Sequence, residues 1–217
     1  MRSIAYYFDK AFLGRYRFPY RKYQDRNKCI FIHIPKAAGT SVLQALGKDG
    51  VEGRDHLPWL VYKKANAKKF DSYFKFTFVR DPLDRAYSAY EYLVKGGNQA
   101  HDLVTADKLK AFSGFEDFVI NGLGKGLYRN HVMFLPQSFF IINNNNELAV
   151  DFVGKFECIE QDFARVKKTL GLTVDLTHEN KGKQSKDLSA IRNNEQIMSV
   201  MFTLYAQDYL LLDYSVE

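Results

Sequence analysis

Residues 29–46 read CIFIHIPKAAGTSVLQAL, and this stretch decides the fold that we expect. It begins with a mostly apolar run that stops at Pro35, as a buried strand does, and passes through a short loop, residues 36–39, into a helical pattern. A strand, a tight loop and a helix N-terminus together form a phosphate cradle. The first helical N–H groups lack intrahelical partners there, and the helix dipole favours an anion.

A second strand and helix follow the same plan. Residues 73–79, YFKFTFV, predict a strand whose alternate phenylalanines share one face, and Arg80 then stands at its carboxyl end. Asp81 is a suitable N-cap for a helix that begins at Pro82 and runs to about residue 94. Ligands bind beyond the carboxyl ends of parallel strands, so we expect Arg80 and the first loop at one rim of the sheet.

The remaining segments complete an α/β pattern with a mostly parallel sheet. We predict strands at 138–142 and 150–156, helices at 115–120, 160–170 and 194–211, and a loop with little regular structure at 98–114. Residues 55–70 are expected to form a loop and then a short helix, and residues 178–187 a polar basic loop.

The net charge of +6 lies at the N-terminal end of the chain. Residues 1–28 hold eight of the 31 basic and two of the 25 acidic residues, so the remainder has 23 of each and is neutral. This aromatic-rich basic arm has two interpretations: it packs across residues 29–217, the main domain, or it attaches to an anionic membrane surface or an acidic partner. Because the body is not basic, we expect no nucleic-acid partner.

Cysteine content and hydropathy bear on the compartment. The two cysteines, Cys29 and Cys158, show no spacing typical of zinc or of a disulfide framework, so we expect no metal and a reducing compartment. No apolar run is long enough for a transmembrane helix, and charged residues break any signal-peptide core near the start. We therefore expect a cytoplasmic protein, with peripheral membrane contact through the arm as the alternative.

The order of residues in the loop distinguishes it from an ATP-binding loop. A Walker A motif has its lysine late, directly before the Ser or Thr, whereas Lys36 comes three residues before Gly39. A phosphate-like group held without obligatory magnesium is thus expected. Arg80 can fork onto a second phosphate, and Ser88 lies about two helical turns farther on, which implies a ligand with phosphates at two ends.

These motifs resemble the PAPS-dependent sulfotransferases, specifically the carbohydrate group related to heparan 2-O- and chondroitin/dermatan sulfotransferases. The similarity covers roughly residues 29–214 and rests on IFIHIPKAAGTS (30–41) and FTFVRDPLDRAYSAY (76–90). Four further segments are similar: HLPWLVYKK (56–64), FLPQSFFI (134–141), FVGKFECIEQDFARVKKTLGL (152–172) and YAQDYLLLDY (205–214). The resemblance implies a single P-loop-like three-layer α/β domain whose central, mostly parallel sheet is flanked by helices.

The resemblance also implies roles for particular residues. Lys36 would stabilise charge on the leaving phosphate, Arg80 and Ser88 would hold the 3′-phosphate of PAPS, and His56 would be the catalytic base. The 5′-phosphosulfate would lie in the cradle of Lys36, Ala37, Ala38, Gly39, Thr40 and Ser41. The expected acceptor is a hydroxyl of a carbohydrate or glycolipid.

Two other functions stay open from the sequence. One is a small-molecule kinase with a P-loop, against which the early position of Lys36 argues. The other is a non-catalytic module that binds a nucleotide or a glycan, against which the presence of Lys36, Arg80 and His56 argues. By its alternation with Ile32 and Ile34, His33 is interpreted as a hydrogen-bonded strand residue rather than as part of the site.

Overall fold

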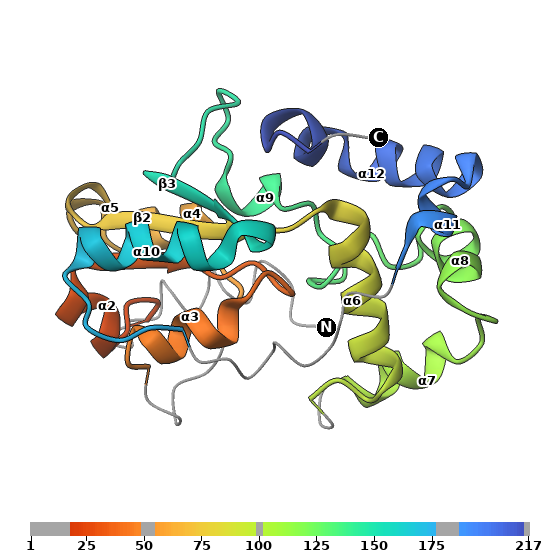
Figure 1. Ribbon diagram of the computed structural model, residues 1–217, viewed down its shortest axis with the longest axis horizontal. Helices are drawn as coiled ribbons and strands as arrows, with labels where there is room; N and C mark the ends of the chain where they lie inside the picture. Colours follow the sequence, from red (N-terminus) through yellow and green to blue (C-terminus); the bar gives the residue numbers. More distant parts are fainter. Residues whose placement is uncertain (1–17, 49–54, 99–101, 177–186, 215–217) are drawn as a thin grey trace. The chain divides into compact units, whose positions relative to one another are not determined.

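The computed structural model describes residues 18–48, 55–98, 102–176 and 187–214 (Figure 1). The described chain forms two compact units. Unit 1 comprises residues 18–79 and 137–176, and unit 2 comprises residues 80–136 and 187–214. Each unit is described by itself below.

Unit 1 is built on a three-stranded parallel sheet with the order β1-β2-β3. The strands are β1 (Cys29–Ile32), β2 (Phe74–Val79) and β3 (Phe152–Lys155). In the register, Ile32 lies opposite Thr77 and Val79 lies opposite Lys155. The carboxyl ends of the three strands therefore meet at one edge of the sheet.

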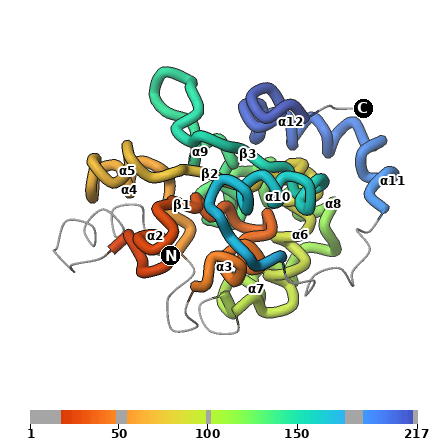
Figure 2. The backbone as a smooth tube through the Cα atoms, turned by 60° about the vertical axis from the view of Figure 1, so that its left-hand side comes forward, coloured from red at the N-terminus to blue at the C-terminus, as the bar shows by residue number. Residues whose placement is uncertain are grey.

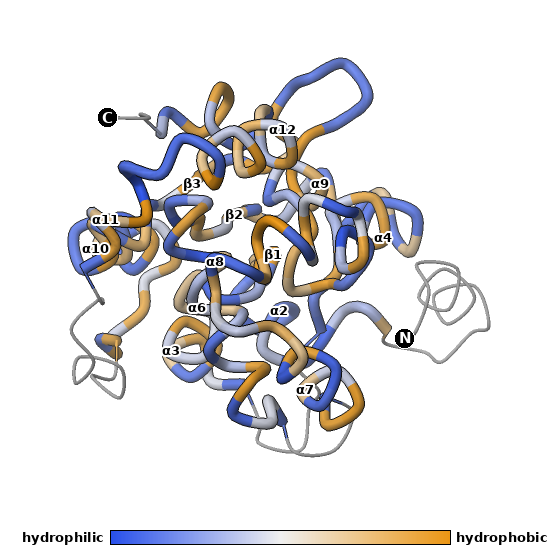
Figure 3. Tube along the Cα trace, turned by 90° about the vertical axis from the view of Figure 1, so that its right-hand side faces the viewer, coloured by the Kyte–Doolittle hydropathy of each residue, from blue (hydrophilic) through white to orange (hydrophobic). Residues whose placement is uncertain are grey.

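Helices cover both faces of this sheet, which gives unit 1 its layered α/β architecture (Figure 3). The helices α3 (Gly39–Ala45) and α10 (Ile159–Leu170) lie on one side, and α4 (Trp59–Ala65) and α9 (Ser138–Ile141) lie on the other. Strand alternation explains how both faces are filled. Cys29, Phe31, Phe76 and Phe78 share a buried cluster with α3 and α10, whereas Ile30 and Ile32, also buried, point to the opposite face.

The described part of the basic arm packs into unit 1. The short helix α2 (Lys22–Asn27) contacts β1, and Tyr23 belongs to the same core as Phe31. The Tyr20 hydroxyl donates to the carbonyls of Tyr62 and Asn66, at 3.0 and 3.1 Å. For residues 18–28 these contacts favour packing; residues 1–17 lie outside the described residues.

Unit 2 is helical. Its helices are α6 (Pro82–Val94), α7 (Leu103–Leu109), α8 (Phe115–Asp117), the π-helix η1 (Phe118–Leu123), α11 (Ser189–Arg192) and α12 (Glu195–Leu211). The apolar face of α6 packs with η1 and α12 around Phe118, Phe134 and Met201. Arg85 is fully buried in this unit, and its guanidinium donates to the carbonyls of Met133 and Leu135.

Most predicted elements of the α/β pattern are confirmed. The strands at 73–79 and 150–156 correspond to β2 and β3, and the helix at 82–94 is α6, with Asp81 as its N-cap and Pro82 in its first turn. The predicted helices at 160–170 and 194–211 are α10 and α12. Residues 55–70 hold α4 and the start of α5 (Ala67–Ser72), and residues 178–186 lie outside the described part.

The predicted strand at 138–142 is wrong. Ser138–Ile141 is one turn of helix, α9, and Ile142 alone makes an antiparallel bridge, to Leu148 across the turn that separates α9 from β3 (Figure 2). A short apolar run suits a buried helical turn as well as a strand, and period alone cannot separate them. The Trp59 indole N–H donates to the Ile142 carbonyl at 3.0 Å, which anchors the end of this turn.

The expectation of a structureless loop at 98–114 is also wrong, because it contains α7. Only Ala106 and Leu109 of this helix are buried, while Leu103 and Val104 are exposed. Two inward positions give too weak a helical period to be read from the sequence. Among the described residues, no helix has the length and apolar character needed to span a membrane.

The sheet predicts a stability effect at Gly154. This residue faces Phe78 across the β2–β3 ladder, and an added Cβ would lie 2.4 Å from the Phe78 ring. Gly154→Ala should therefore lower the free energy of unfolding by roughly 1–3 kcal/mol through overpacking. The matched control is Gly114→Ala, where a Cβ meets nothing within 4 Å. Urea unfolding measures both, and equal effects would contradict the packing argument.

Candidate functional site

The loop after β1 has an unusual backbone. Lys36 and Ala38 adopt φ angles of 66° and 62°, a left-handed conformation that is uncommon for residues other than glycine. Alternating handedness in a short loop turns successive N–H groups to one side and creates an anion-binding concavity. Strained residues of this kind cluster at ligand sites. The backbone thus supports the predicted cradle.

The start of α3 leaves donors for a ligand. The first intrahelical bond of this turn runs from the Val42 N–H to the Ala38 carbonyl, at 3.3 Å, so the N–H groups of residues 39–41 precede it. Ala38 stands at the N-cap and carries no side-chain oxygen that could occupy these donors. Ser41 is buried and Thr40 is half-buried at the same helix end.

Gly39 is required by its neighbour His33. A Cβ at Gly39 would lie 1.8 Å from the His33 Nε2 atom, so only glycine allows the imidazole to pack against this part of the loop. The His33 ring is buried and stacks on the Phe31 ring, with centroids 5.7 Å apart. His33 therefore packs directly against Gly39 of the predicted cradle, a contact that the alternation of the strand did not predict.

His56 lies directly beside His33. The two imidazole centroids are 4.2 Å apart, and the His56 Nδ1 atom is 3.0 Å from the His33 carbonyl oxygen. A carbonyl only accepts hydrogen bonds, so Nδ1 must carry the proton and Nε2 of the neutral ring is the acceptor. This tautomer is the one in which Nε2 can take a proton from a substrate.

The chain around His56 is held on both sides. Arg21 forms an ion pair with Asp55, the residue before His56, and Leu57, the residue after it, is fully buried. The structure therefore brings together His56, His33 and the predicted cradle of residues 36–41 within unit 1.

Arg80 and Ser88 belong to unit 2. Arg80 directly follows β2 in the chain, and its guanidinium lies 4.0 Å from the Asp84 carboxylate. Asp81 caps α6 by accepting from the Asp84 N–H at 2.9 Å. Ser88 is one turn beyond Asp84 and half-buried, so it shares a face of α6 with the residue that contacts Arg80.

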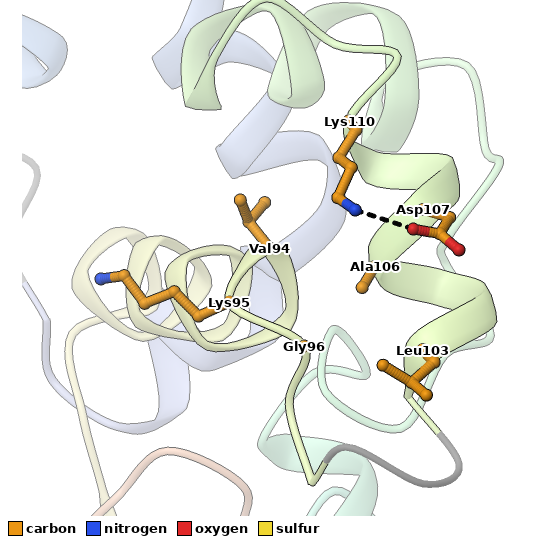
Figure 4. Close-up of a pocket in the computed structure, with 7 residues that line it drawn as sticks. All are labelled: Val94, Lys95, Gly96, Leu103, Ala106, Asp107 and Lys110. Carbon is orange, nitrogen blue, oxygen red and sulfur yellow. Dashed lines mark hydrogen bonds and ion pairs between the residues drawn. The ribbon is translucent and has the colours of Figure 1, made fainter.

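A cavity of about 420 Å³ in unit 2 stands apart from these residues (Figure 4). It lies between the end of α6 and the helix α7, where the Lys110 ammonium bonds to the Asp107 carboxylate at 2.8 Å. Its lining consists of Val94, Lys95, Gly96, Leu103, Ala106, Asp107 and Lys110. The predicted site residues contribute nothing to that lining.

Within the described ranges, no group of three or more His, Cys, Asp or Glu residues is arranged to hold a metal ion. Cys29 is buried, and burial raises the pKa of its thiol to about 12, whereas Cys158 is exposed. His131 is buried against Phe134 and accepts from the Met133 N–H, and burial lowers its pKa.

Comparisons with known proteins agree with the motifs. The model of the "Sulfotransferase family" matches residues 21–215. Human carbohydrate sulfotransferase 9 is 23% identical over 235 aligned positions, which cover 88% of this chain and 52% of the human protein. An Archaeoglobus fulgidus protein described only as uncharacterized is 30% identical over 118 residues, 54% of this chain and 84% of its own length. The chain thus spans about half the length of the human relative, and no solved structure matches it.

The His56 contact makes a prediction that needs no substrate. At a pH where the ring is neutral, two-dimensional ¹⁵N–¹H spectra should show His56 as the Nδ1–H tautomer, because the His33 carbonyl accepts from that atom. His131 provides the contrast, since its Nδ1 accepts from the Met133 N–H and its proton must lie on Nε2. A His56 signal with the Nε2–H pattern would contradict the geometry.

Proposed function

The chain belongs to the sulfotransferase family, and from this premise we propose that it transfers a sulfuryl group from PAPS to a hydroxyl of a carbohydrate or glycolipid acceptor. One observation carries the proposal: His56, with its tautomer fixed by the His33 carbonyl, packs on His33, which in turn packs on Gly39 of the left-handed loop. The carbohydrate class of the acceptor is supported by the similarity to human carbohydrate sulfotransferase 9.

The cradle is suited to the 5′-phosphosulfate of the donor. The N–H groups of residues 37–41 would hold its oxygens. Lys36 would stabilise the negative charge that develops on the phosphate as the S–O bond breaks. In phosphoryl transfer, preorganised electrostatic stabilisation of this kind supplies much of the rate acceleration, and we expect the same for sulfuryl transfer.

His56 would act as the general base. As the acceptor oxygen attacks sulfur, the Nε2 atom takes the hydroxyl proton, and the Nδ1–H bond to the His33 carbonyl steadies the ring as it becomes positively charged. The bond from the acceptor oxygen to sulfur forms while the bond from sulfur to the phosphate oxygen breaks. PAP leaves with the electron pair of that bond.

We assign the 3′-phosphate to Arg80 and Ser88. A guanidinium can donate two parallel hydrogen bonds to a phosphate, and the Ser88 hydroxyl, on the face of α6 that carries Asp84, would add a third donor. PAPS carries a 3′-phosphate that ATP lacks. Contacts from Arg80 and Ser88 to this group would therefore distinguish PAPS from ATP.

The nucleotide assignment predicts a thermal shift. PAP should raise the melting temperature of the wild-type chain without magnesium, by several degrees at about 100 times its Kd, where ligand binding contributes about 2.7 kcal/mol. Lys36→Ala and Arg80→Ala should remove most of that shift, because each deletes a cation at one charged end of the ligand. Lys95→Ala is the control, since it removes the same charge from an exposed lysine paired with Glu91. A full shift in both site variants would contradict the assignment.

The base assignment predicts a loss of turnover without a loss of binding. His56→Ala and His56→Asn should lower kcat by roughly 10²–10⁴-fold while PAP binding stays within a few-fold of wild type. Asparagine is the sharper variant, because its amide retains a donor for the His33 carbonyl but has no basic nitrogen. Transfer of ³⁵S-sulfate from labelled PAPS to a panel of glycans measures the rate. Wild-type turnover in the asparagine variant would exclude His56 as the base.

A further inference from the structure

Arg192 binds two acidic residues that follow Arg80 in the chain, Asp81 and Asp84. Its guanidinium donates to both oxygens of Asp81, at 2.8 and 3.3 Å, and to an oxygen of Asp84 at 2.6 Å. Its neighbour Ile191 is buried in the core of unit 2, which fixes the backbone from which Arg192 reaches out. We propose that Arg192 is a positioning residue that neutralises Asp81 and Asp84 beside Arg80 and so favours binding of the 3′-phosphate there, a role that rests on the function proposed above.

Two carboxylates, Asp81 and Asp84, lie within four residues of Arg80, and left to themselves they would outweigh its single positive charge and repel a phosphate. Arg192 supplies the second positive charge, so the four side chains together are neutral. The phosphate then meets Arg80 without an excess of negative charge beside it.

Distances assign the carboxylates to Arg192 rather than to Arg80. Asp84 is 2.6 Å from the Arg192 guanidinium and 4.0 Å from that of Arg80, so its close partner is Arg192. Asp81 is likewise bound by both terminal nitrogens of Arg192. A bidentate contact of this kind fixes orientation as well as charge. Arg192 thereby occupies the two acids that would otherwise compete with a phosphate for Arg80.

Partial burial strengthens the electrostatic interaction of Arg80 with the neighbouring carboxylates. The side chains of Asp81 and Arg80 are only 11% and 14% exposed, so water screens their interaction less than at the surface. Burial raises the pKa of Asp84, and the nearby Asp81 carboxylate raises it further. Removal of Arg192 would leave two acids without their strongest partner in this partly buried setting.

The test is a double-mutant cycle on PAP affinity. Arg192→Met should raise the Kd for PAP, and the KM for PAPS, by roughly tenfold or more while kcat at saturating PAPS stays near wild type. Adding Asp84→Asn to that variant should recover most of the affinity, because it removes one of the uncompensated negative charges. Arg192→Lys should retain part of the affinity, since it keeps the charge but loses the bidentate contact.

The control is Arg129→Met, which removes the same charge from an arginine of unit 2 that donates to the carbonyls of Leu123 and Gly124. A purely structural role for Arg192 would lower the melting temperature of the unliganded protein, and Asp84→Asn would not restore affinity; that outcome overturns the inference. A loss no greater than that of Arg129→Met overturns it as well. Absence of PAP binding to the wild-type chain would overturn the proposed function and the inference together.

Discussion

The parallel pairing of β1 with β2 fixes where the candidate site can form, because it sets the carboxyl ends of both strands at one edge. The pairing ends with Ile32 opposite Thr77, and the buried Thr77 hydroxyl donates to the Ile32 carbonyl at 2.7 Å. This bond holds the last residue of β1 in place. The loop that begins at His33 therefore leaves the sheet from a rigid point, and the left-handed residues that follow can be maintained despite their conformational cost.

His33 connects the end of β1 with His56 and with Gly39. Its backbone is anchored to the end of β1, its carbonyl sets the tautomer of His56, and its ring excludes any side chain at position 39. One residue thus connects His56, the proposed base, with the loop proposed as the cradle. This contact explains why position 39 requires glycine.

The sequence was informative where local chemistry determines structure. The Asp81-Pro82 pair predicted the start of α6, Gly171 adopts the left-handed φ expected after α10, and alternating phenylalanines placed one face of β2. It failed where tertiary contacts decide, as in α9, which is a single buried turn, and in α7, which buries only two side chains. Alternation with Ile32 and Ile34 suggested that His33 belongs to the strand, but β1 ends at Ile32. The contacts of the His33 ring with residues 39 and 56 join distant parts of the sequence, and periodicity cannot detect them.

Arg192 marks a different limit of sequence reasoning. It lies 111 residues beyond Asp81 in a four-residue helix, and nothing in its local sequence pattern connects it with residues 80–84. Yet the body of the chain carries equal numbers of basic and acidic residues, so an anion site cannot arise from an overall positive field. It must arise from local pairing. In the proposed site, Arg192 neutralises the two carboxylates that follow Arg80, and the affinity for a phosphate would then depend on this local charge balance.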